Sequence, residues 1–90
     1  MTHYVAIFTA SDDGEWRVVF PDVPACEARG QSLQEAKSAG VNELARHFQV
    51  NGGTLPPPRD LAEIERDEAW LLRNEVVLSK VVITMIAVGG

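Results

Sequence analysis

The strongest constraint on the fold is a change of hydrophobic period, from two residues to about four, near residue 32. Before this point, residues 3–9 and 15–20 each alternate between two faces, and an Asp-Gly turn separates them. These features predict a β-hairpin. Prolines 21 and 24 must interrupt the hydrogen-bonding ladder, and residues 26–31 then predict a short third strand, antiparallel to the second.

A helix is predicted to follow, because Ser32-Leu33-Gln34-Glu35 has the composition of a capping box. The helix should extend to about Val50, where Asn51-Gly52-Gly53 favours left-handed backbone. Its apolar positions recur at the helical period: Leu33, Ala36, Gly40, Leu44 and Phe48. Glycine costs about 1 kcal/mol in a helix interior. Gly40 therefore predicts a close approach of the helix to the sheet.

The remaining chain predicts a short helix and a final strand. After the stiff Leu55-Pro56-Pro57-Pro58 segment, Asp60-x-x-Glu63 indicates a helix start, and this helix is predicted to break near Asp67. Lys80 to Val88 is apolar on both faces, which predicts a strand that is buried or packed against another subunit. The order β-β-β-α-(α)-β predicts an α+β fold, an antiparallel-rich sheet with one long helix packed on it.

Size and charge constrain the partners. A chain of 90 residues allows one modest core and often depends on association for stability. We therefore expect a homo-dimer or tetramer. The interface is predicted on the last strand, at Val82, Thr84, Ile86 and Val88. A net charge of −5 argues against direct nucleic-acid binding and suits a basic protein partner, although it also simply favours solubility.

The cysteine content and the two ends of the sequence indicate the cellular compartment. The single cysteine fits a reducing environment, and the N-terminus lacks the basic and apolar regions of a signal peptide. The apolar run at residues 76–88 is too short to span a bilayer. We expect a cytoplasmic protein with no membrane attachment.

No residue set predicts a reaction. Cys26 with His3 or His47 has the composition of a nucleophile and base, but a lone cysteine is more often a small buried hydrophobe. A metal nuclease needs converging carboxylates, whereas the acids here are dispersed and the first strand is apolar. We therefore expect a non-enzymatic protein without catalytic residues, metal site or cofactor.

Two features are candidates for partner binding. Trp16 on the second strand is either a core residue or an interface anchor. Pro21 and Pro24 rigidify the loop around Asp22 and predict that its acidic side chain is held outward toward a basic partner. The alternative for this loop is ordinary turn chemistry, because Asp is common beside Pro.

Residues 16–26, which contain Phe20-Pro21-Asp22-Val23-Pro24-Ala25-Cys26, resemble the opening of HicB-like antitoxins, with their pattern V-x-F-P-D-x-P-G-C. Gly30 to Ala36 resembles the helix start of that family, G-x-[ST]-x-E-E-A. Ala25 departs from the pattern, since the family usually has glycine there. If this position needs a positive φ, alanine strains it.

The resemblance implies a partly reduced ribonuclease-H-like or double-stranded-RNA-binding-like fold. It also implies an antitoxin that neutralises a small basic RNA-cleaving toxin of the HicA type by covering its active surface. Residues 1–90 are expected to form a single HicB-like domain, without the C-terminal DNA-binding module of many HicB proteins. Two alternatives remain open: an orphan HicB-like oligomer that binds another protein or a small ligand, and a nucleic-acid binder.

Overall fold

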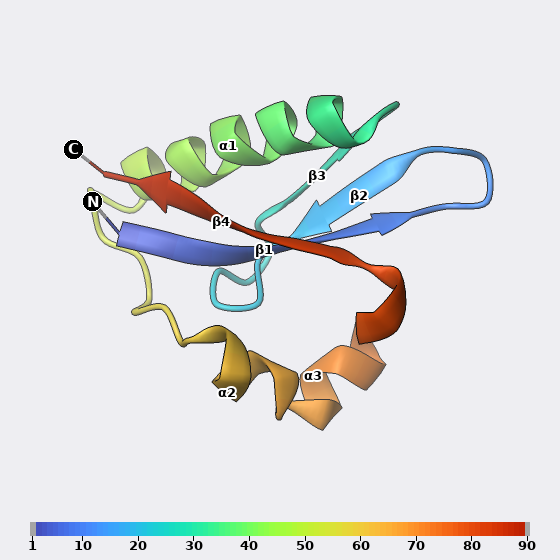
Figure 1. Ribbon diagram of the computed structural model, residues 1–90. Helices are drawn as coiled ribbons and strands as arrows, with labels where there is room; N and C mark the ends of the chain where they lie inside the picture. The colour runs from blue at the N-terminus through green and yellow to red at the C-terminus, as the bar shows by residue number, and fades with distance from the viewer. Residues whose placement is uncertain (1, 90) are drawn as a thin grey trace.

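A four-stranded antiparallel sheet with the order β3-β2-β1-β4 forms the centre of the molecule (Figure 1). The computed structural model describes residues 2–89. The strands are β1 (Thr2–Ala10), β2 (Trp16–Val19), β3 (Glu27–Gly30) and β4 (Val82–Val88). The predicted hairpin and third strand are confirmed. The last strand begins two residues later than expected, because Leu78–Lys80 forms a short 3-10 helix, η1.

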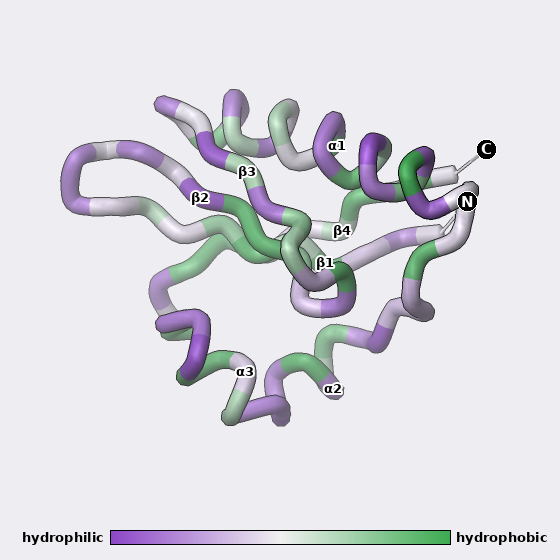
Figure 2. The backbone as a smooth tube through the Cα atoms, turned by 180° about the vertical axis from the view of Figure 1, so that it is seen from behind, coloured by the Kyte–Doolittle hydropathy of each residue, from purple (hydrophilic) through white to green (hydrophobic). Residues whose placement is uncertain are grey.

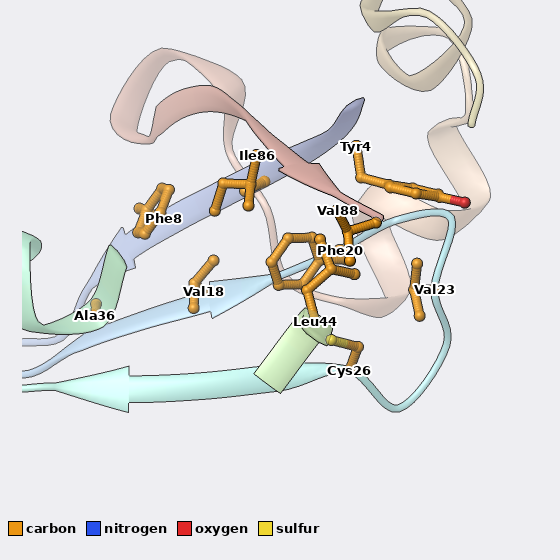
Figure 3. Close-up of a cluster of buried hydrophobic side chains, with 11 residues drawn as sticks. Tyr4, Phe8, Val18, Phe20, Val23, Cys26, Ala36, Leu44, Ile86 and Val88 are labelled. Carbon is orange, nitrogen blue, oxygen red and sulfur yellow. The ribbon is translucent and has the colours of Figure 1, made fainter. Parts of the chain in front are cut away.

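The long helix α1 (Leu33–Val50) lies across one face of the sheet, with the bounds that the sequence predicts (Figure 1). The hydroxyl oxygen of Ser32 accepts a hydrogen bond of 3.1 Å from the amide of Glu35, so the predicted N-cap is confirmed. Beneath α1 lies the larger core cluster (Figure 3). Figure 3 shows Phe8 and Ala36 toward one end of this cluster, with Phe20, Val23 and Cys26 toward the other.

Two glycines set the distance between α1 and the sheet. A Cβ atom on Gly40 would lie 3.0 Å from Cγ1 of Val18, so the predicted close approach is confirmed. A Cβ on Gly30 would lie only 2.4 Å from the backbone nitrogen of Ala36. The chain therefore needs glycine at residue 30 to turn from β3 into α1 without a clash.

The opposite face of the sheet carries a second, thinner layer formed by α2 (Leu61–Glu65) and α3 (Glu68–Arg73) (Figure 1). The expected break occurs at Asp67, whose side chain caps α3. This break resets the helical phase, so that Ile64 and Leu71 are buried whereas Leu72 is 83% exposed. A smaller core cluster joins this layer to the sheet: Val5, Ile7, Val19, Ile64, Leu71 and Val76.

Strand β4 is an edge strand that pairs along its whole length with β1, from Thr2 opposite Val88 to Phe8 opposite Val82. Burial differs along the strand. Ile86 and Val88 belong to the core beneath α1, whereas Val82 and Met85 are 39% and 49% exposed. Only the second half of β4 is therefore buried in the way that the sequence predicts.

Candidate partner-binding surface

The loop between β2 and β3 is built from successive tight turns. The amide of Val23 donates to the carbonyl of Phe20, and the amide of Cys26 donates to the carbonyl of Val23, each over 3.1 Å. Ala25 has φ = 68°, in the left-handed region that favours glycine. The position where Ala25 departs from the HicB pattern thus does require a positive φ, and the alanine is strained.

Within this loop, Asp22 points inward rather than toward a partner. Its side chain is only 8% exposed, and its Oδ1 lies 2.6 Å from Nε of Arg59. Arg59 also donates to Asp67 over 3.0 Å, and these two carboxylates raise the pKa of the guanidinium. The expectation that the prolines hold the Asp22 carboxylate outward is therefore corrected. The carboxylate fastens the loop to the segment that leads into α2.

Pro24 and Ala25 are the exposed residues of the loop, and Pro24 lies between two hollows. One, of about 280 Å³, lies between the loop and α3, and its lining includes Trp70 and Arg73. The other, of about 620 Å³, lies between the loop, the end of α1 and the proline segment, and its lining includes His47 and Leu55. Pro21 is buried beneath the loop. Pro24 and the walls of these hollows are therefore the accessible part of the predicted site.

The structure does not bring Trp16 to this loop. Trp16 begins β2, where it pairs with Ala10 and Gly30, while the loop leaves the other end of that strand. Its indole is partly buried and packs against the core beneath α1. Trp16 therefore acts here as a packing residue, at the opposite end of β2 from Pro24.

The residues predicted for an oligomer interface divide into two pairs. The side chains of Ile86 and Val88 are buried in this chain's own core, so they are not accessible to a second subunit. Val82 and Thr84 lie on the same face of β4 and keep part of their surface exposed. An interface on this strand would therefore use its backbone edge and its first half.

Most of the negative charge lies in the layer of α2 and α3, a feature that the sequence reasoning missed. Residues 60–75 contain six acidic side chains and two arginines, a net charge of −4, within a chain whose net charge is −5. The exposed Leu72 lies in this acidic surface. Figure 2 shows hydrophilic and hydrophobic residues alternating along α3. A count of charge by segment, rather than over the whole chain, would have identified this surface.

The environment of Cys26 opposes a role as nucleophile. Burial, and secondarily the charge of Glu43, raise the pKa of the thiol to about 11, so it is protonated at neutral pH. Nε2 of His47 lies 3.3 Å from Oε1 of Glu43, on the side of α1 near the loop.

Among residues 2–89 there is no group of three or more His, Cys, Asp or Glu side chains placed to share a metal ion. None of the helices described is long and apolar enough to cross a membrane.

An antiparallel sheet between one long capped helix and a layer of short helices defines an α+β domain of the kind found in antitoxins, as solved structures show. The antitoxin HicB from Burkholderia pseudomallei superimposes with a TM-score of 0.76 at 13% identity, covering 99% of this chain and 63% of that one. A HicA3–HicB3 toxin–antitoxin complex gives a TM-score of 0.67 at 18% identity, covering 99% and 100%. A toxin–antitoxin complex from Streptococcus pneumoniae gives 0.70 at 27% identity, covering 98% and 69%.

This chain therefore has a HicB-like fold. It spans less than two thirds of the length of the Burkholderia antitoxin. No family model matches the sequence, and no curated protein does.

Proposed function

We propose that this chain is an antitoxin domain that neutralises a small, basic, RNA-cleaving toxin of the HicA type by covering its active surface. Support comes from the similarity of the fold to chains in two toxin–antitoxin complexes. The observation in this chain that carries the proposal is the acidic surface of α2 and α3, with Leu72 exposed in it.

The substrate of such a toxin is RNA, which carries a negative charge at every phosphate. A protein that holds RNA needs a positive surface to bind phosphate. The acidic layer of residues 60–75 presents charges of the same sign as phosphate, so it can occupy that positive surface and accelerate the encounter. Affinity would then come from a few desolvated apolar contacts, for which Leu72, Trp70 and Pro24 are the accessible candidates.

We also infer where the domain acts and how it assembles. The domain acts in the cytoplasm as a binding protein, without catalytic residues or a cofactor, and it self-associates as a homo-dimer or tetramer. The protonated, buried thiol of Cys26 supports a binding role over a thiol-based reaction.

The test is co-expression with the product of the adjacent gene, followed by titration of the purified pair. A stable complex and loss of toxicity are expected. Glu65→Lys reverses a charge in the acidic layer and should weaken binding about tenfold at low salt, less as salt rises. Asp12→Lys makes the same charge change at the tip of the hairpin and serves as the matched control. Equal losses in the two variants, or no complex at moderate salt, would contradict the proposal.

A second variant separates the apolar contribution from the charge. Leu72→Ala removes an exposed side chain and should leave the fold intact. It should weaken the complex by about tenfold, in the range of a moderate interface contact, and this loss should not depend on salt. Unchanged affinity in Leu72→Ala would place the contact elsewhere than on α3.

A further inference from the structure

The outer edge of β4 lacks the features that normally protect an edge strand. Natural sheets protect their edges with charged side chains, proline, bulges or very short strands, because an open edge pairs readily with another chain. Strand β4 has seven residues, Val-Ile-Thr-Met-Ile-Ala-Val, with neither a charge nor a proline. All seven pair in register with β1 on the inner side, so the outer side is a regular, uncharged template.

The other edge strand differs. Strand β3 has four residues and carries Glu27 and Arg29, so its edge is short and charged. The contrast between the two edges of one sheet indicates that only β4 is adapted for pairing.

Exposed apolar side chains lie on β4 and on one flank of α1. Val82 and Met85 are exposed on the strand itself, and Leu33 and Val41 on α1 are 36% and 40% exposed. Phe48 follows Val41 by seven residues, two helical turns, and therefore lies on the same flank of α1. A Cβ atom on Gly89, just after β4, would lie 3.6 Å from the Phe48 ring. This flank of α1 therefore faces the β4 side of the sheet.

We propose that the β4 edge is occupied by the β4 edge of a second copy of this chain, which joins the two sheets into one. The occupant follows from charge. A basic partner would find no acidic group along β4 to match, whereas an uncharged apolar edge is complementary to itself. The edge and the acidic layer of α2 and α3 thus suit two different partners. This inference rests on the self-association included in the proposed function, and it is independent of toxin binding.

Full pairing of the two strands determines the geometry. An isologous dimer has a two-fold axis, so antiparallel pairing of all seven residues places this axis at Met85, the central residue. Val82 then lies opposite Val88 of the second copy, and Met85 lies opposite itself. Because the axis is perpendicular to the sheet, both α1 helices lie on the same side, with the flanks bearing Leu33 and Val41 turned toward each other.

The first test is the mass of the full chain in solution, by sedimentation velocity from micromolar to hundreds of micromolar concentration. The wild type should be a dimer, or a tetramer built from it. Met85→Lys places two like charges opposite each other and should raise the dissociation constant at least about tenfold. Val50→Lys, at an exposed apolar residue in the last turn of α1, should leave it unchanged. A wild type that stays monomeric, or a dimer that Met85→Lys does not weaken, overturns the proposal.

The second test is specific for the register. Met85→Cys brings two thiols opposite each other and should form an intermolecular disulfide under mild oxidation. Ala87→Cys is the matched control, because its two copies would be separated along the strands by four residues, about 14 Å, too far for a disulfide. Equal cross-linking of the two variants would overturn the pairing about Met85.

Toxin titration of Met85→Lys separates this inference from the antitoxin function. Affinity for the toxin should equal that of the wild type. A monomeric wild type whose toxin binding is lost in Met85→Lys would assign the edge to the toxin, and this would overturn the dimer while leaving the antitoxin function in place.

Discussion

Arg59 satisfies both carboxylate oxygens of Asp22, although the two residues lie 37 positions apart in the sequence. Its Nε donates to Oδ1 over 2.6 Å, and its backbone amide donates to Oδ2 over 2.8 Å. Its Nη1 also donates to Asp67, whose other carboxylate oxygen caps α3 by accepting from the amide of Trp70. The network therefore couples the β2–β3 loop to the acidic layer, the two parts of the proposed toxin-binding surface.

Removing either partner of this pair should destabilise the protein. Asp22→Asn and Arg59→Gln are each expected to lower the free energy of unfolding by about 1–2 kcal/mol, because hydrogen bonds to charged groups are lost beside a mostly buried carboxylate. The double variant should lose less than the sum, with a coupling of about 1 kcal/mol in urea unfolding. Glu65→Gln, an exposed acid of the same layer, serves as the control. Additive losses would show that the pair contributes nothing.

A charge reversal at Asp22 is consequently a poor probe of partner binding. Asp22→Lys would place two cations against each other in the network, so we expect its effect on a toxin complex to follow from a loosened loop. Unfolding measured on the free protein distinguishes the two causes, because a docking role alone would leave its stability unchanged.

Ala25→Gly should stabilise the protein. A left-handed residue other than glycine costs about 1–2 kcal/mol, and the greater freedom of glycine in the unfolded chain offsets part of this. We expect a net gain of about 0.5–1 kcal/mol in urea unfolding. Ala62→Gly in the exposed surface of α2 makes the same replacement at an ordinary helical φ and should cost about 1 kcal/mol. A loss of stability in Ala25→Gly would mean that the strain is relieved in solution.

Local signals in the sequence predicted the elements of the fold well. The alternation of residues 3–9 and 15–20 specified the hairpin, and the cap at Ser32 specified the start of α1. Gly40 correctly indicated close helix packing. Each of these signals lies within one element or reports one contact surface, so its physical cause can be read from neighbouring residues.

The site was less predictable because its contacts are long-range. Nothing near Asp22 in the sequence indicates that its partner is Arg59 rather than solvent. Similarly, whether Leu71 or Leu72 is the buried residue depends on where Asp67 interrupts the helix. A shift of one residue turns the side chain by about 100° around the helix axis. Tertiary pairing and helical phase together decided which acidic and apolar groups reach the surface.

Ser32→Ala should lower the free energy of unfolding by about 1 kcal/mol, because the amide of Glu35 loses its acceptor at the start of α1. Ser32→Asp should cost less, since aspartate is also an effective cap. Ser38→Ala, at an exposed position within α1, should be neutral or slightly stabilising because alanine favours helix. A Ser32→Ala variant with an unchanged urea midpoint would contradict the role of this cap.

The stability of the protein should fall at alkaline pH because of Cys26. Burial raises the pKa of this thiol from its ordinary value of 9.0 to about 11, so the fold favours the protonated form. A group with a raised pKa stabilises fully below its unfolded pKa, and the stabilisation is lost as the pH rises through the folded pKa. Between pH 8 and about pH 10.5, the wild type should lose about 2 kcal/mol relative to Cys26→Ala, which lacks the titrating group. Tyr4, whose pKa burial also raises, titrates in both proteins and cancels in the comparison. Urea unfolding of both proteins across this range measures the difference, and a difference that stays constant with pH would show that the Cys26 thiol is accessible to solvent in the folded protein.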